Sequence, residues 1–282
     1  MSELKGLLGA TEIREIAARI GVTPTKKLGQ NFVVDANVCR KIVSVADVSP
    51  NDIVVEIGPG LGSLSLAIIE SAKHLLAVEI DTRLAAELPQ TFARHEVATD
   101  AFTIINQDAL AVDELPMRPD VLVANLPYNI SVSVLLHFFE RFPTLRSGVV
   151  MVQSEVADRL AAVPGSKSYG SPSVKATWWM QMSAAGGVAR SIFWPVPNVD
   201  SSLVKFVRHE PAGDEALRLR TFEIIDAAFA QRRKMLRAAL SGMFGGSSQA
   251  SAVIESAGID PTLRGEALLL PDFIKIAEAS HS

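Results

Sequence analysis

Two hydrophobic periodicities alternate along most of the chain. Residues 53–55 are consecutive β-branched apolar residues, which predict a strand covered on both faces of a sheet. Apolar residues at helical spacing follow, and the same succession then repeats. The predicted elements are strands at 52–57, 74–80, 102–106, 120–124 and 148–153, and helices at 63–71, 83–94, 132–142 and 155–162. This alternation predicts right-handed βαβ units, which form a mostly parallel sheet with helices on both faces.

Other patterns flank this alternating segment. Apolar positions at helical spacing predict two helices before it, at 11–20 and 36–46. After it, residues 175–182 and 202–207 have the character of two late strands, which suit an antiparallel edge. The prediction is therefore an α/β fold with a Rossmann-like sheet, mostly parallel and bordered by an antiparallel edge strand.

The last part of the chain has a different character. From residue 214 onward strand signals stop and the pattern is helical. We therefore predict two domains. Residues 1–212 form the α/β domain, with a helical lead-in at 1–50, and residues 213–282 form a smaller all-α domain.

Composition narrows the class of protein. The 282 residues are 48% hydrophobic and 21% charged, as in a soluble globular chain with ample core. No apolar run approaches the ~18 residues of a membrane span, and the N-terminus lacks a secretory pattern, so we expect a cytoplasmic protein with no membrane partner. Five scattered histidines predict no metal site. The single cysteine, Cys39, lies in a helical pattern, which favours buried packing over a nucleophilic role.

The turn after the first predicted strand indicates a ligand site. Gly58, Gly60 and Gly62 allow positive φ and leave room for a ligand against the backbone, and the next helix offers its unpaired N–H groups. The spacing G-P-G-L-G is shorter than a dinucleotide fingerprint, and an ordinary strand–turn–helix is the alternative. Glu79 ends the next strand about 20 residues later, where a carboxylate can accept from ribose hydroxyls. This acid favours a nucleoside ligand.

A second turn, Asn125-Leu126-Pro127-Tyr128, follows another strand and faces the same crevice. The Asn125 side-chain oxygen and the Leu126 carbonyl, followed by a proline that lacks an N–H, can accept from the two N–H bonds of an exocyclic aryl amine such as that of adenine. This pairing draws the nitrogen toward tetrahedral geometry and aims its lone pair outward. Tyr128 offers a flat face for the base. Placement of this nitrogen in line with an activated methyl group then accounts for most of the catalysis. By itself the segment could be a simple turn.

Several segments together resemble the ribosomal RNA adenine dimethylases, and among them the bacterial small-subunit enzymes. They are TKKLGQNF at 25–32, EIGPGLG at 56–62, QDAL at 107–110, NLPYNIS at 125–131, FWPVPNVDS at 193–201, AFAQRRKMLR at 228–237 and RGE at 264–266. The resemblance implies a class I methyltransferase fold with a helical RNA-binding domain at the C-terminus. It also implies N6,N6-dimethylation of two adjacent adenosines in the 3′-terminal hairpin of small-subunit (16S) rRNA, with S-adenosyl-L-methionine as cofactor. The partner would be an assembling small subunit, and we expect a monomer.

The resemblance also assigns roles to residues. Gln30, Asn31 and Val33 would bind at the methionine end of the cofactor, and the Gly58–Gly60 turn beside it. Glu79 would accept from the ribose hydroxyls and Asp108 from the adenine amine. Asn125 would meet both the cofactor and the target amine, within a catalytic set of Asn125, Leu126, Pro127, Tyr128 and Phe193. Tyr128 and Phe193 would hold the target base between them, splayed out of its RNA stack.

RNA contact must depend on local charge, because the net charge of −4 does not indicate nucleic-acid binding. Two basic clusters are candidates: Lys26 and Lys27 near the cofactor, and Arg232, Arg233, Lys234 and Arg237 in the C-terminal part. We expect Arg232, Arg233 and Arg237 near one another on a helix, as a strip for A-form phosphates. A solvated helix face is the alternative for each cluster. Residues 178–180 and Met235 are expected to be packing residues.

Three other functions compete with this interpretation. One is an adenine methyltransferase of large-subunit rRNA, of the antibiotic-resistance type, which shares the N-x-P-Y turn. Another is a non-catalytic assembly factor of the small subunit. Methylation of a small molecule or of a protein glutamine is a more distant alternative, because it leaves the basic C-terminal segment unexplained. Fold alone does not separate these functions.

Overall fold

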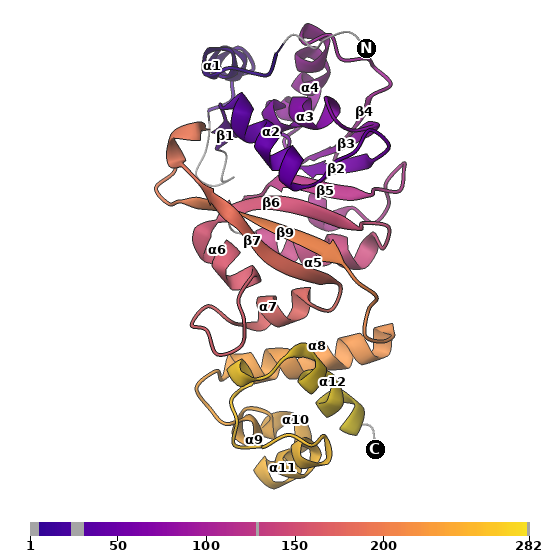
Figure 1. Cartoon of the computed structure of the whole chain (residues 1–282), viewed down its shortest axis with the longest axis vertical. Helices are drawn as coiled ribbons and strands as arrows, with labels where there is room; N and C mark the ends of the chain where they lie inside the picture. Colours follow the sequence, from indigo (N-terminus) through magenta and orange to yellow (C-terminus); the bar gives the residue numbers. More distant parts are fainter. Residues whose placement is uncertain (1–5, 24–30, 128–129, 281–282) are drawn as a thin grey trace. The chain divides into compact units, whose positions relative to one another are not determined.

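The computed structural model in Figure 1 describes residues 6–23, 31–127 and 130–280. The chain forms two compact units. The first comprises Met1–Ala157 and Ser183–Arg208, and the second comprises Asp158–Met182 and His209–Ser282. The grouping of residues 158–182 with the second unit differs from the predicted boundary at 212, which left them in the first domain. The assignment of a separate C-terminal RNA-binding domain stays a prediction.

A seven-stranded sheet has the order β4-β3-β2-β5-β6-β9-β7. The four pairs among β4, β3, β2, β5 and β6 are parallel, and β9 runs antiparallel to β6. In chain order the strands are β2 (Ile53–Ile57), β3 (His74–Glu79), β4 (Phe102–Asn106), β5 (Val121–Asn125), β6 (Ser147–Gln153), β7 (Met180–Val188) and β9 (Ser201–Arg208). The predicted fold, a mostly parallel sheet with an antiparallel strand toward its edge, is confirmed.

The helices of the first unit lie close to their predicted bounds. They are α1 (Ala10–Arg19), α2 (Ala36–Val45), α3 (Ser63–Ile69), α4 (Thr82–Arg94), α5 (Ser131–Arg141) and the start of α6 (Ser154–Leu160). The Asp35 carboxylate accepts from the backbone N–H groups of Asn37 and Val38, so it caps α2. The Asp81 side chain caps α4 in the same way. These caps explain why both helices start where they do.

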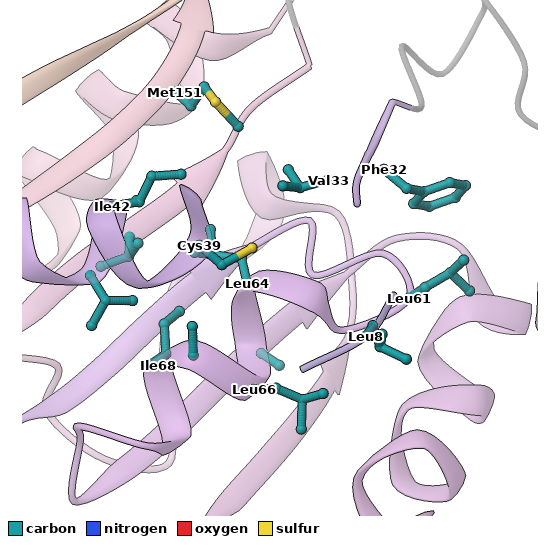
Figure 2. Packing of buried hydrophobic residues seen from close by; sticks show 14 of the residues in the cluster. Leu8, Phe32, Val33, Cys39, Ile42, Leu61, Leu64, Leu66, Ile68 and Met151 are labelled. Carbon is teal, nitrogen blue, oxygen red and sulfur yellow. The ribbon is translucent and has the colours of Figure 1, made fainter. Parts of the chain in front are cut away.

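Helices α2 and α3 share much of the first unit's core. Figure 2 shows Cys39 and Ile42 of α2 beside Leu64 and Ile68 of α3, with Val33 above them. Cys39 is 1% exposed, and burial raises the pKa of its thiol to about 12. A thiol with such a pKa is neutral at physiological pH and is a poor nucleophile. The predicted packing role of Cys39 is confirmed.

A short ribbon joins two distant parts of the first unit. Strand β1 (Phe32–Val33) pairs antiparallel with β8 (Phe193–Trp194), so that Phe32 faces Trp194 and Val33 faces Phe193. The Phe32 and Trp194 rings stack with centroids 6.1 Å apart. This ribbon connects the residues before α2 with those before β9, a contact between segments more than 150 residues apart in sequence.

One predicted strand is only partly confirmed. Residues 175–182 were expected to form a strand, but α7 (Ser171–Ala176) occupies the start of that range and β7 begins only at Met180. Pro172 lies in the first turn of α7, where a proline is compatible with a helix, and the Ser173 hydroxyl accepts from the Gly170 N–H. Residues 177–179 form turns, so only the last three residues of the predicted range, 180–182, lie in a strand.

The second unit is built from helices. They are α7, α8 (Glu215–Ala230), α9 (Leu236–Ala239), α10 (Ser241–Phe244), α11 (Ser247–Ser256) and α12 (Leu270–Ala279). Trp178 and Trp179 are buried, as expected, and both rings pack edge-on against Phe222 of α8. The guanidinium of Arg218 lies over the Trp179 and Phe222 rings and pairs with Glu215. None of the helices in the described ranges is long and apolar enough to span a membrane.

Candidate active site

A cavity of about 270 Å³ lies at the carboxyl ends of the central parallel strands. Its walls come from the ends of β2, β3 and β5, from the turn after β2, and from residues 107–110 after β4. This is the edge at which ligands of open α/β sheets bind. The predicted site residues that line it are Asn31, Val33, Gly58, Gly60, Glu79, Asp108, Asn125 and Pro127.

The glycine turn has the predicted backbone. Gly58, Gly60 and Gly62 have φ of +70°, +59° and +97°, a region that other residues seldom adopt. The Gly58 N–H donates to the Val78 carbonyl at 2.9 Å. A Cβ at Gly60 would lie 3.0 Å from Cε1 of Phe32. The close approach of Phe32 to this turn therefore depends on glycine at position 60.

Glu79 ends β3 and is only 5% exposed. The Gly60 N–H donates to its Oε2 at 3.0 Å, and the Asp81 N–H donates to its Oε1 at 2.9 Å. Burial raises the pKa of this carboxyl, and the two backbone donors act in the opposite direction. Glu79 is thus held rigidly against the glycine turn, at the edge of the cavity. Its contact with ribose hydroxyls stays a prediction.

Glu56 is a site residue that sequence reasoning missed. It lies within β2, is 1% exposed, and lines the cavity. The Ser65 hydroxyl of α3 donates to its Oε2 at 2.5 Å. Burial raises its pKa to about 8, a change that the nearby Glu79 reinforces. The available signal was the acid itself, because a carboxylate inside an apolar strand with both faces covered needs a reason to be there.

Asn125 ends β5 and contacts a residue from the start of the chain. Its side-chain Nδ2 donates to the Asn31 carbonyl at 3.1 Å. Because the Asn31 carbonyl can only accept, this contact fixes the amide and leaves Oδ1 as the acceptor. Both residues line the cavity. The structure therefore brings together two predicted site residues that are 94 positions apart.

The rest of the second turn is partly described. Leu126 is buried, and its N–H donates to the Met151 carbonyl at 3.0 Å, which anchors the turn to β6. Pro127 lines the cavity, and Tyr128 lies outside the described residues. Asp108 is exposed at the cavity's edge, and its Oδ1 accepts from the Leu110 N–H at 2.9 Å. Its role toward an adenine amine stays a prediction.

Phe193 is placed differently from the other predicted site residues. It is 3% exposed, pairs with Val33 in the β1–β8 ribbon, and does not line the cavity. Its predicted stacking on a target base is untested by this arrangement. Gln30, Lys26 and Lys27 lie outside the described residues.

The C-terminal basic cluster is not a helical strip. Helix α8 ends at Ala230, and residues 231–234 form turns. The predicted helix through these residues is therefore wrong. Arg233, Lys234 and Arg237 are exposed, whereas Arg232 pairs with Glu266 at 2.8 Å. Met235 precedes α9 and is 43% exposed, so the expectation that it packs inside is also wrong.

The cavity's chemistry suits a cationic nucleoside ligand. Three acidic side chains line it, those of Glu56, Glu79 and Asp108, and no Lys, Arg or His is among the described residues of its wall. Apolar side chains, including Ile57, Leu84 and others, make up much of the rest. Across the described parts of the chain, no group of three or more His, Cys, Asp or Glu residues could hold a metal ion. The residues present therefore fit S-adenosylmethionine, which carries a positive sulfonium, ribose hydroxyls and an adenine.

Known proteins match nearly the whole chain. A family model described as "Ribosomal RNA adenine dimethylase" matches residues 22–278. A protein of Leifsonia xyli subsp. xyli named "Ribosomal RNA small subunit methyltransferase A" is 59% identical over 280 residues, which is 98% of this chain and 99% of the relative. A protein of Streptomyces griseus with the same name is 56% identical over 280 residues, which is 98% of this chain and 96% of the relative.

Two solved structures share the fold. A dimethyladenosine transferase from Plasmodium falciparum has a TM-score of 0.74 at 23% identity and covers 87% of this chain and 95% of its own. The 23S rRNA methyltransferase ErmE has a TM-score of 0.66 at 23% identity and covers 89% of this chain and all of its own. At these identities the likeness concerns the fold alone.

Proposed function

Because the chain belongs to the ribosomal RNA adenine dimethylase family, we propose that it methylates N6 of two adjacent adenosines in the 3′-terminal hairpin of small-subunit rRNA, with S-adenosylmethionine as methyl donor. The observation that carries this proposal is the Asn125 amide, held by Asn31 at the wall of an acidic cavity with its Oδ1 left as acceptor. We expect a monomer that acts in the cytoplasm on an assembling small subunit.

The cavity's residues can divide the cofactor among them. S-adenosylmethionine supplies an electrophilic methyl group on a sulfonium. Glu79 would accept from the ribose hydroxyls, since two backbone donors already fix its carboxylate. Asp108 would accept from the adenine amine at the cavity's edge. Asn31, Val33 and the neighbouring Gln30 would bind the methionine end, beside the Gly58–Gly60 backbone.

The target amine would be activated by hydrogen-bond geometry. The Asn125 Oδ1 and the Leu126 carbonyl would each accept one N–H bond of the adenine N6 amine. Two acceptors in this arrangement favour a tetrahedral nitrogen, whose lone pair then points at the methyl group. Because residue 127 is proline, its backbone nitrogen carries no hydrogen that could compete with the amine N–H bonds for these acceptors. Placement replaces a strong base, because the methylated nitrogen is acidic enough to lose its proton to water.

Stacking and backbone contacts would place the base and the RNA. Tyr128 would stack on the target base, and Phe193 would do so from the other side if the β1–β8 ribbon uncovers it. The exposed Arg233, Lys234 and Arg237 would contact phosphates, with Lys26 and Lys27 as a second group. Arg232 would help by holding this turn through Glu266 rather than by contacting RNA.

The substrate is taken as the small subunit because of the relatives' names. Relatives covering 98% of this chain at 56–59% identity are named as small-subunit methyltransferases. ErmE, named for 23S rRNA, resembles the chain at 23% identity and so supports only the shared fold. Large-subunit methylation and a purely non-catalytic assembly role are therefore treated as outcomes of the test.

The test uses small subunits from a strain that lacks the modification. These small subunits, and large subunits in a parallel reaction, are incubated with the protein and S-adenosylmethionine, and the digested rRNA is analysed by mass spectrometry. Wild type and the exposed control Asn51→Ala should produce dimethyladenosine in the 3′-terminal hairpin, and Asn125→Ala should lose about 10²-fold or more of the rate. Methylation of large-subunit rRNA instead would favour the competing enzyme. Tight subunit binding without methyl transfer would leave the assembly role and refute the catalytic proposal.

A further inference from the structure

Trp194 is a half-buried aromatic residue that lies just outside the cavity. It ends β8 and does not belong to the cavity wall, whereas Phe32, its cross-strand partner in the ribbon, does. The two rings stack with their centroids 6.1 Å apart and their planes inclined by 25°. Trp194 therefore supports the wall of the cavity from outside, through the ring of Phe32.

The ring of Phe32 contacts two features of the first unit. One is Trp194, and the other is the glycine turn, because a Cβ at Gly60 would lie 3.0 Å from Cε1 of this ring. The turn itself is anchored to the sheet by the Gly58 N–H, which donates to the Val78 carbonyl at 2.9 Å. Without the indole, one of the two contacts is lost and the backbone at Phe32 gains freedom to move.

The backbone at this point holds a side chain of the active site. Asn31 directly precedes Phe32, and its carbonyl accepts from Nδ2 of Asn125 at 3.1 Å. A side-chain amide that turns by 180° exchanges its oxygen and nitrogen with little change in shape. In the turned orientation the Asn125 NH₂ group would face the N–H bonds of the target amine, and two donors form no hydrogen bond. The Asn31 carbonyl therefore selects the orientation in which Oδ1 is the acceptor.

We propose that Trp194 is a positioning residue for methyl transfer. By stacking on Phe32 it keeps the Asn31 carbonyl within hydrogen-bond distance of Asn125, and thereby fixes the oxygen that accepts from the target amine. This inference rests on the proposed methylation of adenine N6. Trp194 contacts neither the cofactor nor the base in this scheme. Its loss should slow the transfer step, because small misplacements of a catalytic group are costly in rate.

A role that is only structural leads to a different expectation. If Trp194 merely stabilised the ribbon, its loss would slow the reaction by the same factor whether or not Asn125 is present. A positioning role depends on the Asn125 amide, so its effect disappears when that amide is removed. A double-mutant cycle therefore separates the two roles.

The first experiment measures single-turnover methyl transfer to small subunits that lack the modification, at saturating S-adenosylmethionine. Trp194→Ala should lower the maximal rate about tenfold and leave the subunit concentration at half-maximal rate within about twofold of wild type. Trp194→Phe keeps a ring on Phe32 and should retain most of the rate. Phe206→Leu breaks another aromatic pair of the same unit, with Phe139, outside the cavity. As a control for lost stability, it should transfer at the wild-type rate.

The cycle adds Asn125→Ala and the double variant Asn125→Ala/Trp194→Ala. Asn125→Ala is already slow, and the second substitution should change its rate by less than about twofold. A further tenfold loss in the double variant would overturn the inference, as would a wild-type rate for Trp194→Ala or a Trp194→Phe rate as low as that of Trp194→Ala. Absence of methyl transfer to small subunits by wild type would refute the proposed function, and the next measurement would still test the role of Trp194.

The second experiment observes the hydrogen bond without RNA or cofactor. The chain is labelled with ¹⁵N-asparagine, and the Asn125 side-chain signal is identified by its loss in Asn125→Ala. The Nδ2 hydrogen that binds the Asn31 carbonyl should exchange slowly with solvent in wild type and Trp194→Phe, and about tenfold faster in Trp194→Ala. If circular dichroism shows that Trp194→Ala is unfolded, Trp194→Leu keeps the apolar bulk without the flat ring and takes its place. Equal exchange in wild type and the ringless variant would overturn the inference.

Discussion

Gly60→Ala adds one methyl group at the point where the glycine turn meets the β1–β8 ribbon. Gly60 has a φ of +59°, and its Cβ would lie 3.0 Å from Cε1 and 3.1 Å from Cδ1 of Phe32. Phe32 cannot move freely, because it is buried, stacks on Trp194, and directly follows Asn31, whose carbonyl holds Asn125. The added methyl should therefore affect both stability and the site.

The magnitude has two parts. A left-handed backbone costs a non-glycine residue about 1–2 kcal/mol. Overpacking against a confined ring adds about 1–3 kcal/mol. Gly58→Ala and Gly21→Ala are controls that separate these parts. Both glycines have a similar backbone, with φ values of +70° and +64°. An added Cβ would have its nearest neighbour at 3.9 Å at Gly58 and none within 4 Å at Gly21. Gly60→Ala should thus cost about 1–3 kcal/mol more than either control.

The assay compares chemical denaturation of the three variants, each with and without S-adenosylhomocysteine. Gly21→Ala should lose only backbone stability and should bind as wild type does. Gly60→Ala should lose more stability and should also bind more weakly, because movement of Phe32 displaces the Asn31 carbonyl. If Gly60→Ala were no less stable than Gly21→Ala, the inferred contact between Phe32 and the turn would be refuted.

Three further predictions concern the first unit. Gly148→Ala should prevent folding or lower the free energy of unfolding by more than about 3 kcal/mol. The reason is that its Cβ would lie 2.1 Å from the Leu122 carbonyl oxygen and 2.4 Å from Cζ of Phe206. Circular dichroism will show whether the sheet forms. The Glu56 carboxyl has a pKa of 4.5 in the unfolded chain and about 8 when folded, so the folded state holds its proton longer. Stability of the ligand-free protein should fall as pH rises from 4.5 to 8, and the pH dependence of urea denaturation in Glu56→Gln should lack this component. Cys39 should not react with a thiol reagent at pH 8 until the chain is unfolded, when one equivalent should react; labelling of the native protein at the rate of a free thiol would contradict its burial.

Much of the fold followed from local patterns. The strand at 53–57 was predictable because an apolar β-branched run suits a position covered on both faces, and the structure places β2 in the middle of the sheet. The positive φ values of the glycine turn were predictable because few other residues adopt them. An antiparallel strand toward the edge of the sheet was also predicted, and β9 runs antiparallel to β6.

Local patterns failed where a distant neighbour sets the outcome. Residues 175–182 are apolar enough for a strand, yet α7 extends to Ala176, residues 177–179 form turns, and β7 begins only at Met180. Trp178 and Trp179 in these turns are buried against Phe222 of α8, which lies more than 40 residues away in the sequence. Met235 was expected inside and is exposed, because α8 stops at Ala230 and breaks the helical period. Arg232 lies in a basic run but pairs with Glu266, so its charge is partly neutralised within the second unit.

The sequence by itself determined most elements of the first unit and predicted eight of the residues that line its cavity, because strand period, glycine turns and the acid at 79 are local properties. Only the tertiary structure decided how they combine. It placed the Asn31 carbonyl against the Asn125 amide, buried Phe193 opposite Val33, and enclosed Glu56 so that its proton is retained. These outcomes depend on contacts and desolvation between distant segments, and no local pattern encodes the dielectric environment of a side chain.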